Sequence, residues 1–141
     1  MQQTLAQAGN RYLSDRVLTA SPVELTAMLF DAACASSRGA IKAMDESDFS
    51  TARLRLLKAQ DLVSELRSAL DRSVGSMATN LDSLYAWCLS LLVQANVRRD
   101  AQLVTDALAV LDPLRTAWRQ AHLGAAATSE SSTRAAESYA A

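Results

Sequence analysis

The chain has 141 residues, and its 14 Lys and Arg residues nearly balance its 15 Asp and Glu residues, which gives a net charge of −1. A chain of this length suits one domain with a sizeable core, and the near-neutral charge argues against a nucleic-acid partner. Half of the residues are hydrophobic and only 5% are aromatic, and Ala and Leu dominate, which favours helices over sheets.

The N-terminal segment, residues 1–20, is weakly patterned and carries Tyr12, Leu13 and Val17. We expect it to form a mobile strap or one short helical turn. Its first residues contain no basic region followed by an apolar run, so no secretory signal is predicted. The chain contains no stretch that approaches the roughly 20 apolar residues of a membrane span. The sequence therefore predicts a cytoplasmic protein without stable membrane insertion.

The first long helix is predicted from Pro22 to Met44. Ser21 suits the N-cap, Pro22 suits the first helical position, and Glu24 completes a capping box with Ser21. Asp48 can cap the helix that follows a short polar link. Apolar residues recur at helical spacing behind the predicted start: Leu25, Met28, Leu29, Ala32 and Ala33.

The second helix is predicted from Phe49 to Arg72. Its apolar positions alternate steps of four and three, which is the spacing of a bundle seam. Gly75 lies in a short break after this helix and is predicted to be a turn residue. The seam positions are Ala52, Leu56, Ala59, Val63, Leu66 and Leu70.

The third helix is predicted from Met77 to Asn96 and carries two apolar stripes. A helix that is apolar over so much of its circumference either lies deep in the protein or meets a second partner. The first stripe contains Leu81, Leu84, Cys88, Leu91 and Ala95, and the second contains Tyr85, Leu89 and Leu92.

The fourth helix is predicted from Ala101 to Ala121, with Asp100 as its N-cap. Its stripe contains Val104, Leu108, Leu111, Leu114 and Trp118. Pro113 removes one helical hydrogen bond, so we expect a bend near Val110 or a restart of the helix after Asp112.

Four amphipathic helices with short links predict an all-α fold, an antiparallel four-helix bundle over residues 21–123. The strap, residues 1–20, precedes this bundle. Residues 124–141 are rich in Ala, Ser and Thr, and we expect them to form a disordered tail because they offer little to bury.

The sequence contains no constellation that indicates catalysis. A di-metal site in a bundle would need Glu-x-x-His pairs, but the one histidine is His122 at the ragged end of the last helix. Gly-rich phosphate loops are missing as well. Cys34 and Cys88 lie in apolar helical patterns without metal-ligand spacing, which indicates buried thiols in a reducing compartment. We therefore predict no enzyme, no metal and no cofactor.

Because no catalytic site is predicted, we expect the function to depend on binding at the protein surface. Excess apolar area on the third helix, next to an apolar strap, suggests a groove for an incoming helix or extended chain. The alternative is that the strap simply closes the bundle, and periodicity alone favours neither.

Five segments also match a known pattern in the right order. They are Thr19–Leu25 with Met28–Asp31, Lys58–Leu66, Asn80–Leu81 with Leu84–Tyr85, Gln94–Val97 with Asp100, and Ala117–Ala121. In these segments the chain resembles the FliS family of flagellar secretion chaperones, and the resemblance covers residues 12–121.

The resemblance implies a bundle that binds the disordered C-terminal segment of flagellin in the cytoplasm. It further implies that flagellin is held unpolymerised and delivered to the flagellar type III export apparatus. The export apparatus and other flagellar regulators are then expected as further partners of this chain. The flagellin segment would fold on binding, with helices in apolar grooves. Tyr12 and Val17 match residues of the strap, which in the family can cover part of the groove when flagellin is absent.

The chain departs from the family pattern on the third helix. The family commonly carries an acid and a basic pair where this chain has Ala86, Ser90 and Leu91. The resemblance therefore does not extend to polar contacts of those groups with flagellin, which keeps open a second hypothesis: a helical adaptor or regulator that binds a different flagellar protein.

Apolar side chains are expected to supply most of the binding area, and the alternative for each is an ordinary core position. Asn96 would fix the link to the fourth helix or pair with the partner's backbone. The predicted flagellin-binding residues are Tyr12, Val17, Leu25, Met28, Leu29, Leu81, Leu84, Tyr85, Leu92 and Asn96.

Overall fold

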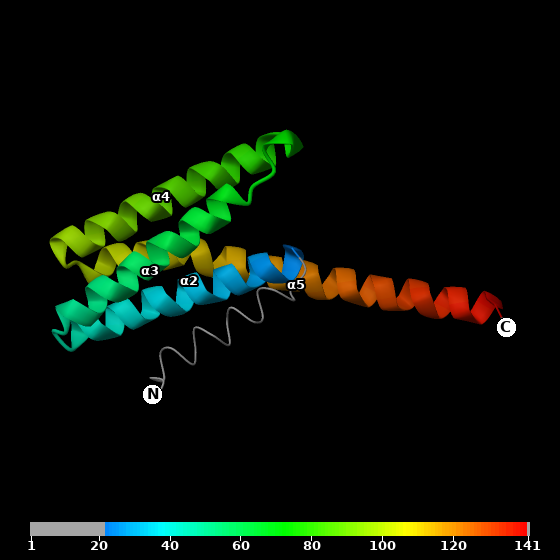
Figure 1. The fold of residues 1–141 in the computed structure, drawn as a ribbon, viewed down its shortest axis with the longest axis horizontal. Helices are drawn as coiled ribbons and strands as arrows, with labels where there is room; N and C mark the ends of the chain where they lie inside the picture. Colours follow the sequence, from blue (N-terminus) through cyan, green and yellow to red (C-terminus); the bar gives the residue numbers. More distant parts are fainter. Residues whose placement is uncertain (1–21, 141) are drawn as a thin grey trace, which may run out of the picture.

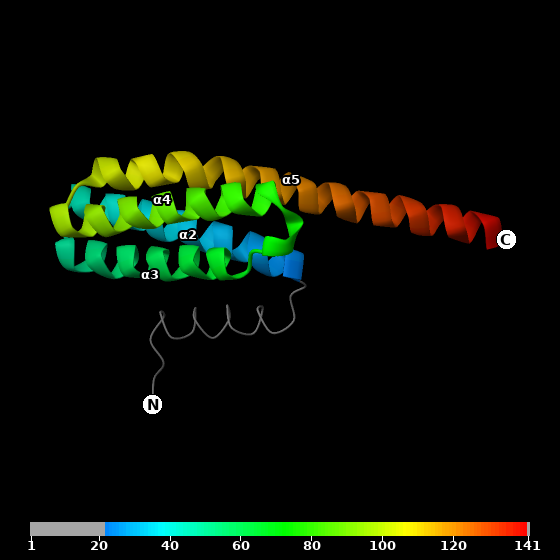
Figure 2. The same ribbon diagram turned by 90° about the horizontal axis from the view of Figure 1, so that it is seen from above.

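The computed structural model describes residues 22–140, which contain helices and no strand. Helices α2 (Pro22–Asp45), α3 (Phe49–Ser68), α4 (Ser76–Arg98) and α5 (Ala101–Ala140) follow one another, with a 3₁₀ turn η1 (Arg72–Val74) before α4. Figures 1 and 2 show successive helices running in opposite directions, and α2 and α4 each pack against both α3 and α5. The predicted all-α, antiparallel four-helix bundle is confirmed.

Two of the predicted helix caps are present. The Asp48 carboxylate accepts a hydrogen bond from the backbone N–H of Thr51 at 3.1 Å, at the start of α3. The Asp100 carboxylate accepts one from the backbone N–H of Gln102 at 2.9 Å, at the start of α5. Each carboxylate satisfies a donor that the first helical turn leaves free. The predicted Ser21 cap lies outside the described residues.

Helix α3 ends at Ser68, before the predicted Arg72. The Asp71 carboxylate accepts a hydrogen bond from the backbone N–H of Ser73 at 3.0 Å, and this local bond competes with continued α-helix. Gly75 then turns the chain with φ of 84°, a conformation that glycine adopts at little cost. The prediction of a turn at Gly75 is confirmed.

Small side chains fill much of the core between α2 and α3. Ala33, Ala40, Ala52 and Ala59 are all at most 1% exposed. Because alanine has no atoms beyond Cβ, helices lined by it can approach closely. The large core residues include Phe30, Leu56, Leu66, Leu92 and Leu111.

Helix α5 continues without interruption through Pro113, so the predicted restart after Asp112 is wrong. Ala109, whose carbonyl Pro113 cannot bond, and Pro113 are both exposed, whereas Leu111 between them is buried. The backbone then stays helical to Ala140, where the sequence predicts a disordered tail, and Figure 2 shows this part projecting past the bundle. Alanine has the highest helix propensity, and a formed helix extends more easily than a new one begins.

Candidate functional site

The predicted binding residues on α2 lie in its first turns. Leu25, Met28 and Leu29 are all partly buried, and Leu29 packs against the core. Each therefore combines a role in the bundle with some surface that a partner can contact. Tyr12 and Val17 lie outside the described residues.

Tyr85 and Leu92 on α4 belong to the core, with exposed fractions of 2% and 0%. The Tyr85 ring centre lies 6.2 Å from that of Phe30, at a tilt of 51°. Burial raises the pKa of Tyr85 to about 12, and the neighbouring Cys88 contributes to this shift. These two residues support the surface of α4 from beneath, so the second apolar stripe lies deep in the protein.

Leu81 lines an apolar cavity at the end of the bundle where α3 leads into α4. The cavity measures about 250 Å³ and is also lined by Ala69, Leu70, Asp71, Met77, Ala78 and Trp118. The Trp118 indole N–H donates to the Val23 carbonyl at 3.2 Å, which ties α5 to the start of α2. Leu84, farther along α4, is 37% exposed.

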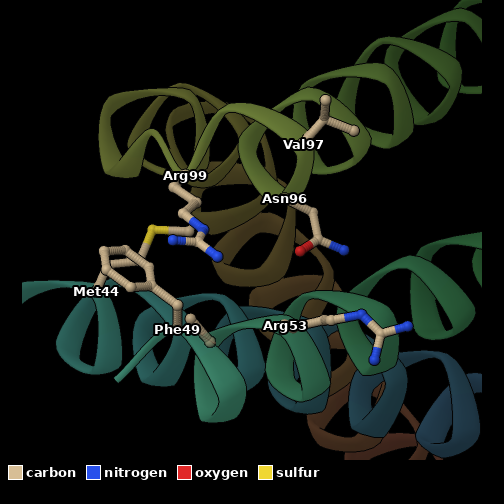
Figure 3. Close-up of a pocket in the computed structure, with 7 residues that line it drawn as sticks. Met44, Phe49, Arg53, Asn96, Val97 and Arg99 are labelled. Carbon is tan, nitrogen blue, oxygen red and sulfur yellow. The ribbon is translucent and has the colours of Figure 1, made fainter. Parts of the chain in front are cut away.

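Asn96 lies at the opposite end of α4 and lines a different cavity, of about 280 Å³ (Figure 3). The structure thus joins Leu81 to the apolar cavity beside Trp118, whereas Asn96 takes no part in that site.

One face of α4 carries exposed apolar side chains that were not predicted from the sequence. We define the outer face of α4 as Ala86, Trp87, Ser90, Val93 and Val97. Trp87 is 55% exposed, Val93 46% and Val97 79%. Sequence periodicity missed all three, although one signal was available: the chain has no charged residue between Asp82 and Arg98. An exposed helix face normally carries charges, so their absence over this stretch marks a surface of another kind.

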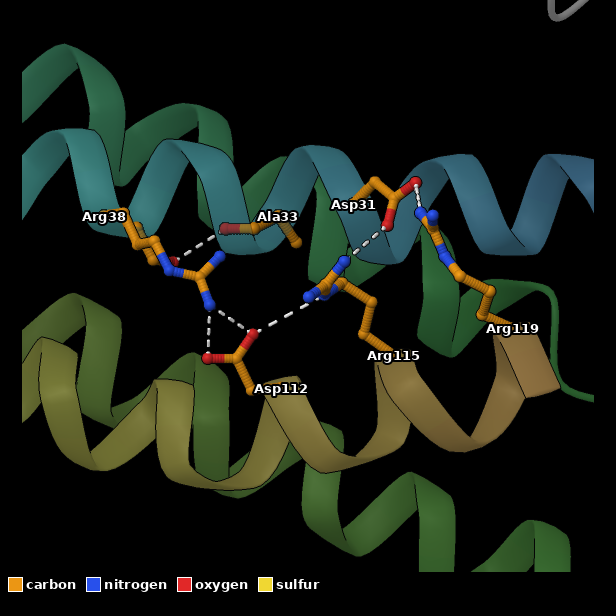
Figure 4. Close-up of polar contacts among 7 residues, drawn as sticks. Asp31, Ala33, Arg38, Asp112, Arg115 and Arg119 are labelled. Carbon is orange, nitrogen blue, oxygen red and sulfur yellow. Dashed lines mark hydrogen bonds and ion pairs between the residues drawn. The ribbon is translucent and has the colours of Figure 1, made fainter.

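The seam between α2 and α5, unlike the uncharged outer face of α4, is lined by charged side chains (Figure 4). Five side chains, Arg38, Asp112, Arg115, Asp31 and Arg119, alternate in sign across it and form what we call the α2–α5 charge ladder. The Arg115 guanidinium bridges Asp112 at 3.5 Å and Asp31 at 3.3 Å. Partial burial opposes ionisation of Asp112, but hydrogen bonding and attraction from Arg38 prevail and lower its pKa.

A smaller charge cluster marks the start of the uncharged stretch. The Asp82 carboxylate accepts a hydrogen bond from Arg67 Nε at 2.8 Å and one from Arg72 at 3.2 Å. The hydrogen bond from Arg67 is the main reason why the pKa of Asp82 is lowered, and burial works against it. This cluster links α3 and η1 to α4 and leaves the outer face of α4 beyond it free of charge.

Comparisons with known proteins decide the family. Residues 5–125 match the family model described as flagellar protein FliS. The chain belongs to the FliS family of flagellar secretion chaperones. It is 35% identical over 106 residues to the flagellar secretion chaperone FliS of Salmonella typhimurium, covering 74% of this chain and 78% of the relative. It is 31% identical over 110 residues to that of Bacillus subtilis, covering 78% and 82%, and 30% identical over 123 residues to that of Escherichia coli, covering 86% and 88%.

Two of the three positions where the resemblance leads us to expect charged residues lie on the outer face of α4. Ala86 is partly buried and Ser90 is exposed, whereas Leu91, at the third position, is a core residue with 4% exposure. Neither Ala86 nor Ser90 is charged, which keeps this part of the surface free of charge.

The described residues of this FliS-family bundle hold no group of three or more His, Cys, Asp or Glu side chains placed to bind a metal ion. Among the helices that the structure describes, none combines the length and apolar character needed to cross a membrane. Cys34 and Cys88 are unbridged and buried. Burial, reinforced by Asp112, raises the pKa of Cys34 to about 12, and burial raises that of Cys88 to about 11. Both thiols stay protonated and unreactive at neutral pH.

Proposed function

We propose that this protein binds the disordered C-terminal segment of flagellin in the cytoplasm, holds it unpolymerised and assists its delivery to the flagellar export apparatus. The observation that carries the proposal is the outer face of α4, with Trp87 and Val97 more than half exposed on a helix free of charge over that stretch. Exposed apolar patches of this kind mark protein interaction sites. Membership of a chaperone family for flagellar secretion supports the choice of partner.

An amphipathic helix of the partner fits this surface best. Val93 and Val97 lie on one side of α4 with Ala86 and Ser90, and Trp87 borders that side, so an incoming helix can pack its own apolar stripe there. Each Å² of apolar area removed from water contributes about 25 cal/mol. That gain must exceed the entropy lost when a disordered segment becomes ordered, which makes a large contact area necessary.

The predicted groove residues then divide into two roles. Leu25, Met28 and Leu29 on α2, and Leu81 and Leu84 on α4, offer partly exposed area at the end of the bundle that holds the apolar cavity. Tyr85 and Leu92 act from beneath by holding α4 in position. Tyr12 and Val17 belong to the strap and would compete with flagellin for the groove.

Titration calorimetry of the full chain with the C-terminal flagellin segment of the same organism tests the proposal. We expect tight one-to-one binding with a large negative heat-capacity change, because folding on an apolar surface buries that surface. Absence of heat and of a complex in gel filtration would contradict the proposed function.

A second candidate function is that of a helical adaptor for another flagellar protein. Ala86 and Ser90 favour it, because charged groups that the family commonly uses there are missing. In that case the flagellin segment would fail to bind, whereas a different flagellar protein would co-purify with the chain and lose binding when Trp87 is replaced by Asp.

A further inference from the structure

The cavity beside Asn96 differs in chemistry from the apolar surfaces of the bundle. It lies where α2 leads into α3 and where α4 leads into α5, and its volume is about 280 Å³ (Figure 3). Met44, Phe49, Ala52 and Val97 supply its apolar lining, and Arg53, Asn96 and Arg99 supply its polar lining. Two cations and one amide therefore line the same cavity beside apolar walls, and no acidic side chain lines it.

The two arginines of this cavity have no carboxylate partner, a property that they share with Arg55 and Arg98 among the described arginines. Within residues 22–140, Arg53 and Arg99 make no ion pair with any carboxylate, whereas arginines in the α2–α5 charge ladder and beside Asp82 each bind an aspartate. Two positive charges that line one small cavity repel each other. A bound anion would remove that repulsion and gain attraction from both.

Arg99 is held in place before any ligand arrives. It is the C-cap of α4 with φ of 53° and ψ of 45°, and its backbone N–H bonds to the Ala95 carbonyl. Its guanidinium carbon lies 4.6 Å from the centre of the Phe49 ring, a cation–π contact. A side chain fixed in this way loses little conformational freedom on binding.

The charge of this cavity comes from its side chains rather than from helix dipoles. The start of α3, at Phe49, and the end of α4, at Arg98, meet here. A helix start favours anions and a helix end disfavours them, so the two effects offset each other.

We propose that this cavity binds a carboxylate group on a short apolar stem, supplied by an acidic side chain or by the chain end of a bound peptide. Arginine and carboxylate form strong, charge-assisted hydrogen bonds, and the Asn96 amide adds a further donor. Met44, Phe49 and Ala52 contact the methylene groups of the stem. A free phosphate would place oxygens against these apolar walls without hydrogen-bond partners, which disfavours it.

The site itself can be tested without any peptide, by NMR titration of the full chain with sodium butyrate. We expect the side-chain N–H signals of Arg53, Arg99 and Asn96 to shift to saturation with butyrate and not with butyramide, which lacks the charge. These shifts should vanish in the Arg53→Gln, Arg99→Gln double variant. Absence of saturable shifts, or equal shifts with butyramide, would overturn the proposal, as would tighter binding of inorganic phosphate than of butyrate.

Calorimetry with the flagellin segment tests the peptide as the source of the carboxylate, and this step rests on the proposed function. The double variant should bind the segment about tenfold more weakly. Arg98→Gln is a control for the loss of one positive charge, because it removes that charge from an exposed neighbouring position and should bind like wild type. A segment whose acidic residues are replaced by their amides should bind wild type more weakly and lose nothing further in the double variant.

The two experiments separate the two proposals. Butyrate binding without flagellin binding would support the carboxylate site and contradict the proposed function. If wild type, control and double variant bind flagellin equally well and butyrate causes no shifts, the carboxylate site is overturned. The proposed function would stand in that case. Thermal melting of each variant, expected to match wild type, shows that the bundle is intact.

Discussion

The seam between α2 and α5 and the outer face of α4 are both surface features of the same small bundle, yet their chemistry is opposite. Along the seam, the α2–α5 charge ladder satisfies its charges internally, with side-chain exposures from 31% to 51%. Along α4, Trp87 and Val97 present apolar area to water with no charge between Asp82 and Arg98. A partner gains free energy by covering apolar area, whereas covering ion pairs costs desolvation. The contrast therefore supports the proposal that a partner binds on α4.

The largest expected effect is on a residue just beneath the α4 surface. Tyr85→Asp would place a carboxylate where the native side chain is 2% exposed and where no cation is paired with it. We expect a loss of at least about 4 kcal/mol in the free energy of unfolding, or no folded protein, because an unpaired buried charge is strongly destabilising. Circular dichroism with urea and thermal unfolding measures this. A variant that melts within a few degrees of wild type would mean that Tyr85 is accessible.

Trp87→Asp is the matched substitution two residues farther along the same helix. Because Trp87 is 55% exposed, we expect the free energy of unfolding to change by only about 0.5 kcal/mol. Partner affinity should fall by about tenfold or more, equivalent to about 1.4 kcal/mol. Calorimetry with the flagellin segment checks the binding and thermal melting checks the fold. Unchanged affinity would remove the outer face of α4 from the binding site.

Asp112→Asn probes the α2–α5 charge ladder. The variant loses the ion pairs of Asp112 with Arg38 and Arg115, and exposed pairs of this kind contribute about 0.5–1 kcal/mol. We expect a loss of that size in urea unfolding, a smaller difference from wild type at high salt, and unchanged partner affinity. A clear loss of affinity would show that the partner also contacts the seam.

The smallest effect concerns pH and the cluster at the start of the uncharged stretch. The hydrogen bond from Arg67 lowers the pKa of Asp82 in the folded protein below the ordinary value near 3.9. Its stabilising contribution is therefore present above pH of about 4 and is lost as the pH falls through the folded pKa. We expect Asp82→Asn to have a shallower loss of stability than wild type in acid unfolding curves. Parallel curves for the two proteins would contradict this assignment.

Much of the fold was predictable from spacing and capping chemistry. Asp48 and Asp100 fix the starts of α3 and α5, and apolar residues at steps of three and four give the bundle. The end of α3 was not predictable from its stripe, because the local hydrogen bonds of Asp71 decide it. The continuity of α5 through Pro113 is compatible with the exposure of Ala109, whose free carbonyl water can reach, and only the folded arrangement reveals that exposure.

The candidate surface was less predictable, for a geometrical reason. Periodicity gives the stripes of a helix, but the rotation of the helix against its neighbours decides which stripe faces inward. On α4 this rotation buries Tyr85 and Leu92 and exposes Trp87 and Val97. The charge-free sequence between Asp82 and Arg98 carried the missing information, since an ordinary solvated helix face normally carries charges. The binding role of the predicted groove residues stays a prediction.

The two buried thiols give the molecule separate reporters of how its seams open. Cys34 lies on α2 beside Asp112 of α5, and the Cys88 thiol donates to the Ala107 carbonyl across the α4–α5 contact at 3.8 Å. Because both thiols are shielded and protonated, their alkylation requires a transient separation of helices, and its rate measures how often that separation occurs. A partner seated on α4 should therefore slow the labelling of Cys88 more than that of Cys34.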